Sequence, residues 1–269
     1  MKPSAAMSKP EPATAADAPL IRLQDVHKRF GALTVLDGLS LDIRRGETTV
    51  IMGPSGTGKS VLLKHIVGLI RPDRGRVFFD ADCVSEMPER TLLKLRTRMG
   101  FLFQLAALFD SMTVGENVAF ALREHTDKGE ADIRRTVAEK LAMVGLEGIE
   151  GKAIGELSGG MKKRVALARA IALDPEVILY DEPTTGLDPQ RSDVINTLIN
   201  RLKERLKVTS VVVTHDLACV AKVADRVIML KGGRIRFDGA HAELLNHPDP
   251  EVQGFIRGEA TEADLAALD

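Results

Sequence analysis

The sequence has little net charge, no long apolar run and few cysteines. Its 37 Lys and Arg residues are balanced by 38 Asp and Glu residues, which leaves a formal net charge of -1. Nucleic acids and anionic membrane surfaces attract an excess of basic side chains, and this balance provides none. We therefore expect no nucleic-acid partner.

The apolar stretches are short and interrupted. One of the longest, Val61 to Ile70, contains Lys64 and His65 and falls well below the roughly 20 residues that span a bilayer. The sequence thus predicts no membrane-spanning helix. Residues 1–19 are rich in Ala and Pro and lack the apolar core of a secretory signal, so they are predicted to be a disordered lead-in.

The two cysteines, Cys83 and Cys219, lie far apart in a sequence with no export signal. They are expected to be free thiols in a reducing cytosol rather than a disulfide. A 44% hydrophobic content over 269 residues is sufficient for a sizeable core.

Apolar periodicity predicts an α/β fold with a parallel sheet. Alternating segments favour half-buried strands, continuous apolar runs favour buried ones, and the order strand, helix, strand favours parallel pairing. The predicted elements are strands at 21–30, 39–43, 48–52, 76–80, 176–182 and 209–215, a helix after Gly58 whose apolar spacing runs as far as Ile70, a helix at 194–206, a mainly helical region at 113–172, and a closing hairpin at 226–239 that turns at Gly232 and Gly233.

The segment GPSGTGKS, between a predicted strand and a predicted helix, carries the strongest chemical signal. It matches the pattern G-x-x-x-x-G-K-[ST] of a phosphate-binding P-loop, and these flanks make a plain Gly-rich turn a poor alternative. Backbone N–H groups surround the phosphates, Lys59 reaches the β- and γ-phosphates, and the Ser60 hydroxyl can bind Mg²⁺. The predicted nucleotide-binding residues here are Gly53, Pro54, Ser55, Gly56, Thr57, Gly58, Lys59, Ser60 and Val61.

Two adjacent acids end the predicted strand at 176–182. Asp181 is the expected metal ligand, because Mg²⁺ prefers hard oxygen ligands. Glu182 is the candidate general base, since a carboxylate beside the γ-phosphate can orient or deprotonate the attacking water. Adjacent acids can also form a solvated loop or a helix cap, but these follow four apolar residues in a chain with a P-loop.

His215 ends the next predicted strand in the same way. The carboxyl ends of parallel strands are where such sheets bind ligands, so a contact between His215 and the γ-phosphate is expected. A structural or surface histidine is the alternative.

The segment LSGGM places Ser158, Gly159 and Gly160 just before a predicted helix. Ser158 can cap that helix, and the glycines allow backbone N–H groups to approach an anion. This segment and the P-loop could bind one phosphate together only if two chains met head to tail. An ordinary capped helix remains the alternative.

These motifs, with Gln104, LDP at 187–189 and His215, occur in the order and spacing of the nucleotide-binding subunits of ABC transporters, which the chain resembles over nearly all of residues 20–240. The resemblance implies the P-loop NTPase ABC ATPase fold: a RecA-like parallel-sheet core with an antiparallel β portion and an inserted α-helical subdomain. It also implies ATP and Mg²⁺ as cofactors, and a homodimer that buries two ATP molecules between one P-loop and the partner's LSGGM segment.

The implied domain division is a lead-in at 1–19, an ABC ATPase domain at 20–246 with its helical subdomain at about 105–172, and a short C-terminal helix with an acidic tail at 247–269.

The same resemblance implies further roles at single residues. Phe30 would stack on adenine, Gln104 would sense Mg²⁺ and the γ-phosphate, Asp188 would lie at the dimer seam, and His215 would support the γ-phosphate. Phe30 could instead be a core aromatic, and Asp188 with Pro189 could be only a helix cap and first turn.

Two positions depart from the family pattern. Val61 stands where a second hydroxyl often follows the P-loop, and Met161 replaces the more common Gln of the signature segment. Neither change touches Lys59, Asp181 or Glu182, so hydrolysis is still expected.

Longer stretches at 52–75, 103–126, 156–189 and 246–258 resemble the ATPases of Mla and Mce phospholipid transport systems. This likeness implies a peripheral subunit on the cytoplasmic face of the inner membrane, working with an MlaE-like permease, an Mce-domain lipid-binding protein and, in some systems, a small STAS-domain subunit. An ATPase of a small-solute importer, such as an amino-acid importer, shares every core motif. A soluble ABC ATPase is disfavoured by the single cassette and the lack of a basic patch.

The segment FLFQLAALFDSM, at 101–112, places Gln104 between a predicted strand end and an apolar run. In the family this run leads into the helical subdomain, where a helix of the permease binds. We predict that the segment joins ATP sensing to the membrane partner. Burial in the subdomain core is the alternative for each apolar side chain.

Overall fold

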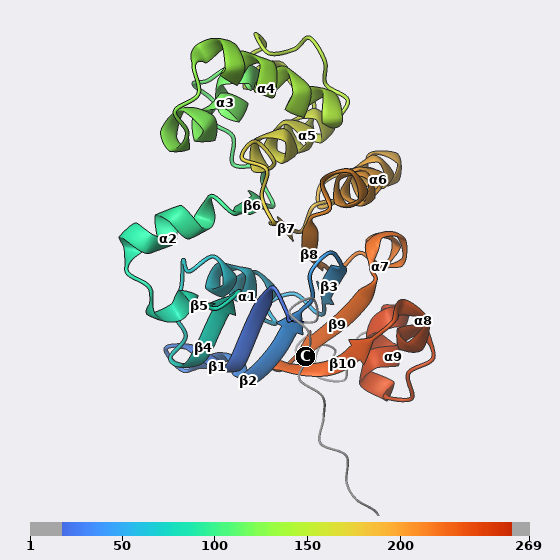
Figure 1. Cartoon of the computed structure of the whole chain (residues 1–269). Coiled ribbons are helices and arrows are strands. Elements are labelled where there is room, and N and C mark those ends of the chain that lie inside the picture. Colours follow the sequence, from blue (N-terminus) through green and yellow to red (C-terminus); the bar gives the residue numbers. More distant parts are fainter. Residues whose placement is uncertain (1–17, 260–269) are drawn as a thin grey trace, which may run out of the picture.

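The computed structural model describes residues 18–259 and contains two sheets (Figure 1). Most of the predicted lead-in and the end of the acidic tail, residues 1–17 and 260–269, lie outside the described residues. The first sheet is antiparallel, in the order β2-β1-β4-β5. Its strands are β1 (Ile21–Phe30), β2 (Leu33–Ile43), β4 (Arg74–Phe79) and β5 (Asp82–Cys83).

The second sheet has the order β10-β9-β3-β8-β7-β6. All its neighbours are parallel except the hairpin of β9 and β10. Its strands are β3 (Thr48–Met52), β6 (Met99–Leu102), β7 (Val177–Asp181), β8 (Thr209–Thr214), β9 (Arg226–Lys231) and β10 (Arg234–Gly239). The predicted parallel strands and the predicted hairpin are confirmed.

Both faces of the parallel sheet are buried, which explains its continuous apolar strands. Along β3, Ile51 packs into a core with the antiparallel sheet and α1 (Lys59–Ile66), while Val50 and Met52 pack into a second core with helices on the opposite face. Because successive side chains of a strand point to opposite faces of the sheet, one apolar run contributes to both cores.

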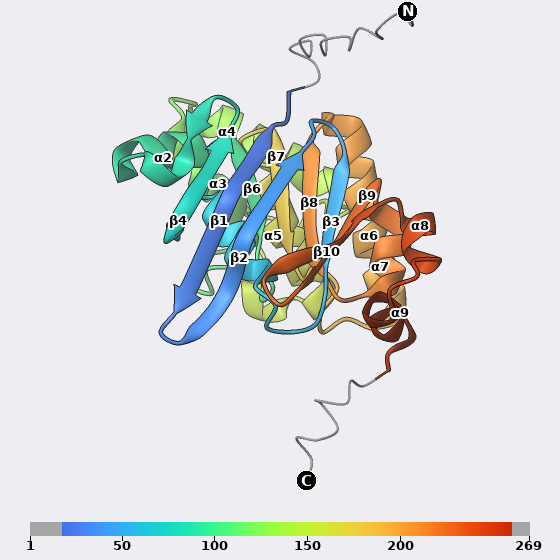
Figure 2. The same cartoon turned by 90° about the horizontal axis from the view of Figure 1, so that it is seen from below.

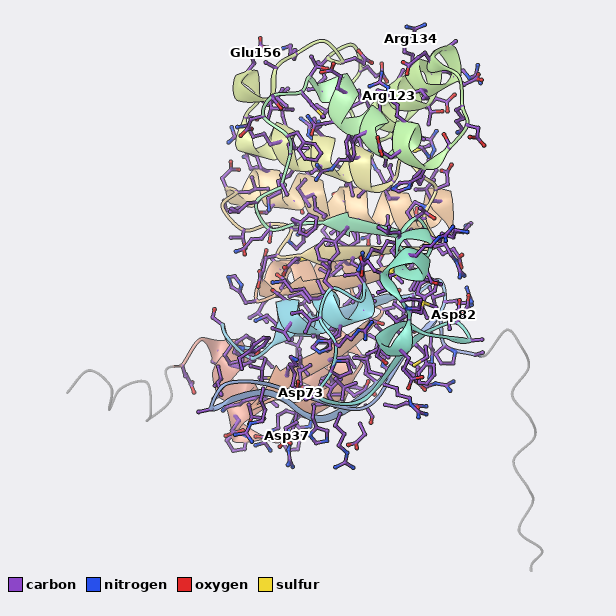
Figure 3. The ribbon with its side chains drawn as sticks, turned by 90° about the vertical axis from the view of Figure 1, so that its left-hand side faces the viewer. Asp37, Asp73, Asp82, Arg123, Arg134 and Glu156 are labelled. Atoms are coloured by element: carbon purple, nitrogen blue, oxygen red, sulfur yellow. The ribbon has the colours of Figure 1, made fainter. Side chains whose placement is uncertain are left out.

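Three helices form a group at the far end of the molecule from the antiparallel sheet (Figure 1). Figure 3 shows Arg123 and Arg134 on this group, with Glu156 from the turn that precedes α5, opposite Asp37 and Asp73 of the antiparallel sheet region. The group consists of α3 (Val114–His125), α4 (Glu130–Met143) and α5 (Gly159–Ala170). These helices coincide with the predicted helical region.

The remaining helices lie at the edges and on one face of the parallel sheet (Figure 2). They are α2 (Glu89–Arg96), α6 (Pro189–Leu206), α7 (Leu217–Val223), α8 (His241–Leu245) and α9 (Pro250–Arg257). No helix of residues 18–259 combines the length and the apolar character that crossing a membrane requires.

Helix α1 ends at Ile66, although apolar spacing predicts helix as far as Ile70. Gly68 has a φ of 67°, and the N–H groups of Leu69 and Ile70 both donate to the Lys64 carbonyl. The left-handed glycine therefore stops the helix before the periodic pattern does.

Candidate nucleotide-binding site

The loop from β3 to α1 depends on glycine at two points. Gly53 has a φ of 146°, and a Cβ there would lie 2.2 Å from the Leu230 carbonyl oxygen. Gly58 has a φ of 91°, and a Cβ there would lie 2.8 Å from Val35 Cγ1. Gly58 supplies no side-chain cap to α1, so the first-turn N–H groups of that helix face the loop and provide a ready anion site.

Lys59 lies buried beneath this loop. Its ammonium donates hydrogen bonds to the carbonyl oxygens of Gly53, at 2.8 Å, and Pro54, at 2.9 Å. Burial lowers the pKa of Lys59, while the nearby carboxylates of Glu182 and Asp181 oppose that shift. A cation is thus held where the loop would surround phosphates.

Ser60 and Asp181 bring the start of α1 to the end of β7. The Ser60 hydroxyl donates a 2.7 Å hydrogen bond to Asp181 Oδ1. Burial raises the pKa of the Asp181 carboxyl, the Ser60 hydrogen bond lowers it, and the charge of Glu182 raises it again.

Glu182 directly follows β7 and adopts a left-handed φ of 50°. Its carboxylate lies 2.9 to 3.0 Å from His215 Nδ1, and the Thr185 hydroxyl donates to it at 3.3 Å. The histidine side chain is 55% exposed. The two residues predicted to act on the γ-phosphate and the attacking water therefore already touch each other.

These elements surround a pocket of about 330 Å³. Its walls combine the loop, the two predicted catalytic side chains, the predicted adenine-stacking aromatic and the predicted γ-phosphate sensor. The lining residues are Phe30, Val35, Ser55, Gly56, Gly58, Lys59, Ser60, Val61, Gln104, Glu182 and His215. Thr57 lies beside them, donating its hydroxyl to the Pro54 carbonyl at 2.8 Å.

Phe30 forms part of the pocket wall rather than the core. It ends β1 and is 48% exposed, and Lys28 Nζ lies 5.5 Å from its ring centroid. Gln104, just beyond β6, is also exposed. Both positions leave the side chain available to a ligand.

The signature segment and Asp188 lie apart from this pocket. Ser158 caps α5, accepting a hydrogen bond from the Met161 N–H at 3.4 Å, and Gly159 and Gly160 form the first turn. Asp188 caps α6, accepting from the Arg191 N–H at 3.0 Å. Within one chain Ser158 and Asp188 cap helices and no residue of the signature segment lines the pocket, so a nucleotide contact by that segment would need a second chain.

Sequence reasoning missed one buried residue beside the site. Lys163 lies on α5 and donates to the carbonyl oxygens of Gln104 and Glu182. In the run KKR at 162–164 it resembles a solvated charge, but it shares a helix face with Ala166 and Leu167, three and four residues later, which are buried. That spacing is the sequence signal that indicates burial of Lys163.

The sequence model of the ABC transporter family matches residues 36–185, which is more than half of the chain. The chain belongs to the ABC transporter family. As in that family, it is an ATP-binding ATPase subunit, and the pocket described above contains its P-loop.

Several curated transport ATP-binding proteins are similar to this chain along most of their length. The intermembrane phospholipid transport ATP-binding protein MlaF of Haemophilus influenzae is 44% identical over 90% of this chain and 91% of its own. MlaF of Escherichia coli is 44% identical over 90% of each chain. The probable ribonucleotide transport ATP-binding protein mkl of Mycobacterium leprae is 44% identical over 92% of this chain and 75% of its own.

Solved ABC cassettes share the fold. A dimeric cassette in a post-hydrolysis state with ADP and Pi is 35% identical, with a TM-score of 0.76 over 82% of this chain and 98% of its own. The cbiO1 protein of Clostridium perfringens, part of an ABC transporter complex, is 29% identical, with a TM-score of 0.79 over 94% and 99%. The predicted ABC ATPase fold is thereby confirmed.

Proposed function

We propose that this chain hydrolyses ATP to drive phospholipid transport through a separate membrane permease. The observation that carries the proposal is the 44% identity to MlaF over about nine-tenths of both chains. The mkl relatives favour a second candidate, ribonucleotide transport. We prefer phospholipid because this chain spans 90% or more of the MlaF proteins but 75% of the Mycobacterium leprae protein.

The donor set beside the P-loop fits Mg²⁺. Ser60 and Asp181 offer hard oxygen ligands within 2.7 Å of each other, and no group of three or more His, Cys, Asp or Glu side chains among residues 18–259 forms a closed metal cage. Mg²⁺ characteristically takes one or two protein oxygens and completes its shell with water and phosphate. We assign Ser60, Asp181 and Gln104 to it; when bound, the ion would neutralise charge on the phosphates.

The other groups of the site each have a separate task in ATP binding and hydrolysis. The P-loop N–H groups and Lys59 bind the phosphates. Glu182 orients and deprotonates the attacking water, and His215, in contact with it, orients the carboxylate and supports the γ-phosphate. Phe30 would stack on adenine through its exposed ring.

The site is proposed to be completed by a second copy of the chain. At the start of α5, Ser158 and Gly159 are exposed and Gly160 is buried, and none of the three lines the pocket of its own P-loop, so we propose that they meet the partner's nucleotide. Asp188 would then lie near the seam between the copies. A related cassette with ADP and Pi is dimeric, which supports this arrangement.

An apolar groove offers a surface for the permease. It is lined by Leu93, Phe101, Phe103, Ala107, Phe109, Phe120 and neighbouring residues of β6, α2, α3 and α5. Phe109 and Phe120 pack with ring centroids 5.1 Å apart, and each ring remains about two-fifths exposed. Leu105, just outside the groove, is 89% exposed. Exposed aromatic clusters of this kind mark binding sites.

The groove is pre-shaped by a buried amide. Asn117 accepts a hydrogen bond from the Phe109 N–H at 2.9 Å and donates to the carbonyl oxygens of Phe109 and Thr113. The backbone that presents Phe109 is therefore fixed before a partner arrives. We propose that a cytoplasmic helix of an MlaE-like permease binds here and holds the ATPase peripherally at the inner membrane.

Purification of the tagged chain from its native membrane, in mild detergent, tests the function. Mass spectrometry of the bound subunits and lipids should recover an MlaE-like permease, an Mce-domain protein, phospholipid and, in systems that have one, a STAS-domain subunit. An amino-acid permease with a periplasmic receptor, or bound ribonucleotide in place of lipid, would overturn the phospholipid assignment while leaving the ATPase assignment intact.

A further inference from the structure

Lys163 is a nearly buried cation that the proposed hydrolysis does not use. It lies in the second turn of α5, which packs against β6 (Figure 1), and is 5% exposed. None of the ion pairs among residues 18–259 includes it. Burial lowers its pKa, while the charges of Glu182 and Asp181 oppose the shift. A buried charge without an ion pair is costly, so its hydrogen bonds must account for its presence.

Those hydrogen bonds reach two of the residues that line the nucleotide pocket. Lys163 Nζ donates to the Gln104 carbonyl at 2.6 Å and to the Glu182 carbonyl at 3.3 Å. One ammonium group thereby joins the segment after β6 and the segment after β7 to α5, the helix that Ser158 caps.

The Glu182 backbone needs such support. Its φ of 50° is unfavourable for a residue with a side chain, and its N–H donates to the Val213 carbonyl at 2.9 Å. In an extended strand the side chain of Glu182 would point away from that of Asp181. With the left-handed turn, both carboxylates act on Lys59, and the Glu182 carbonyl accepts hydrogen bonds from Lys163 and from the Thr185 N–H.

The segment that follows Gln104 is also strained. Ala106 and Ala107 have φ values of 63° and 50°, and Arg169, further along α5, donates to both of their carbonyls at 2.9 and 2.7 Å. Lys163 holds the beginning of this segment and Arg169 holds its end. Only Lys163 also reaches Glu182.

We propose that Lys163 is a positioning residue for ATP hydrolysis, which holds Gln104 and the Glu182 turn in register with each other and with the signature helix. This inference rests on the proposed roles of Gln104 and Glu182. Phosphate binding by the P-loop does not involve Lys163, so its loss affects turnover rather than nucleotide affinity.

The test compares Lys163→Met with Lys140→Met in the full-length protein. Lys140 is equally buried, at 4% exposed, and lies on α4, where it pairs with Asp174 far from the P-loop pocket. We expect kcat to fall by about 10- to 100-fold in Lys163→Met, since small displacements of catalytic groups have effects of this size. In Lys163→Met, the KM for ATP and the Kd for ATP from calorimetry should change by less than about threefold. Lys163→Arg should recover part of kcat, because a guanidinium keeps the positive charge and the hydrogen-bond donors. Lys140→Met should lower Tm without lowering kcat.

Two outcomes would overturn the proposal. One is an unchanged kcat in Lys163→Met; the other is a loss of kcat that Lys140→Met reproduces at equal loss of Tm, which would indicate general destabilisation. Glu182→Gln, assayed alongside, distinguishes failure of the proposed function from failure of this inference. Retained turnover in Glu182→Gln would rule out Glu182 as the general base. Lost turnover in Glu182→Gln with a normal kcat in Lys163→Met would rule out only the role of Lys163.

Discussion

The Ser60 hydroxyl donates to Asp181 Oδ1 across 2.7 Å, joining the first turn of α1 to the last residue of β7. Two segments that are 121 residues apart in the chain meet at this contact. Both oxygens lie where parallel strands of an α/β sheet end, which is the usual ligand-binding edge of such folds.

Replacing Ser60 with Ala should raise the Mg²⁺ concentration that gives half-maximal ATP hydrolysis, and it should lower the free energy of unfolding. The variant loses one oxygen ligand and leaves the buried Asp181 carboxylate without that donor, at a cost of about 1 to 3 kcal/mol. Magnesium titrations of ATPase rate and urea unfolding measure the two effects. Ser60→Thr keeps the hydroxyl and is the control; equal behaviour of both variants would contradict the assignment.

Asp181→Asn should become progressively more stable than the wild type as pH rises, in the absence of nucleotide and metal. Burial raises the pKa of Asp181 above its ordinary value of 3.8, so the folded protein holds this proton more tightly than the unfolded chain. That contribution to stability is present below pH 3.8 and is lost as pH rises through the folded pKa. Urea unfolding of both proteins at a series of pH values measures the difference, and curves that stay parallel across this range would refute it.

Glu182→Gln should bind ATP with wild-type affinity and lose at least about 100-fold in turnover, because the amide cannot accept the proton of the attacking water while the P-loop is unchanged. If two chains enclose the nucleotide, the variant should accumulate as an ATP-bound dimer. Light scattering with ATP, together with phosphate release, measures both properties. Turnover at the wild-type rate would exclude Glu182 as the base.

Lys59→Ala should reduce ATP affinity about 10- to 100-fold, the effect expected when one hydrogen-bonding charge is removed from a phosphate. Isothermal calorimetry measures the Kd. Lys64→Ala is the matched control, since Lys64 lies on the same helix with its side chain exposed. Equal affinities of the two variants would argue against phosphate binding by Lys59.

Phe109→Asp should keep the fold and basal ATPase activity but abolish co-purification with the permease. The ring is 42% exposed in the apolar groove, so a carboxylate there remains hydrated in the free chain and becomes buried only on docking. Leu245→Asp introduces the same charge at an exposed leucine of α8 and should co-purify normally. Normal recovery of the permease with Phe109→Asp would show that the groove is not the docking surface.

Local patterns were sufficient to predict most of the strands and the phosphate loop, but not β5 or the first half of β2. The continuous apolar run at 48–52 and the glycines at Gly53 and Gly58 each leave their own signature in the sequence, since burial on both faces and close backbone approach restrict residue choice. The parallel pairing of β7 with β8 followed from the intervening helix.

The backbone around the site was not predictable in the same way. The left-handed conformations of Glu182, Ala106 and Ala107 occur at residues whose types do not favour them; backbone hydrogen bonds and side-chain hydrogen bonds from Lys163 and Arg169 hold them together. The early end of α1 likewise depends on one glycine within an otherwise helical pattern.

The packing of Gly58 against Val35 joins the phosphate loop directly to strand β2, the partner of the strand that ends in Phe30. The aromatic ring and the phosphate loop are therefore connected through packing and strand pairing, which set the distance between them. A pocket whose base and phosphate subsites are a set distance apart selects ligands by the length from base to phosphate. Most of the conformational entropy lost on binding is then lost by the ligand rather than by the protein.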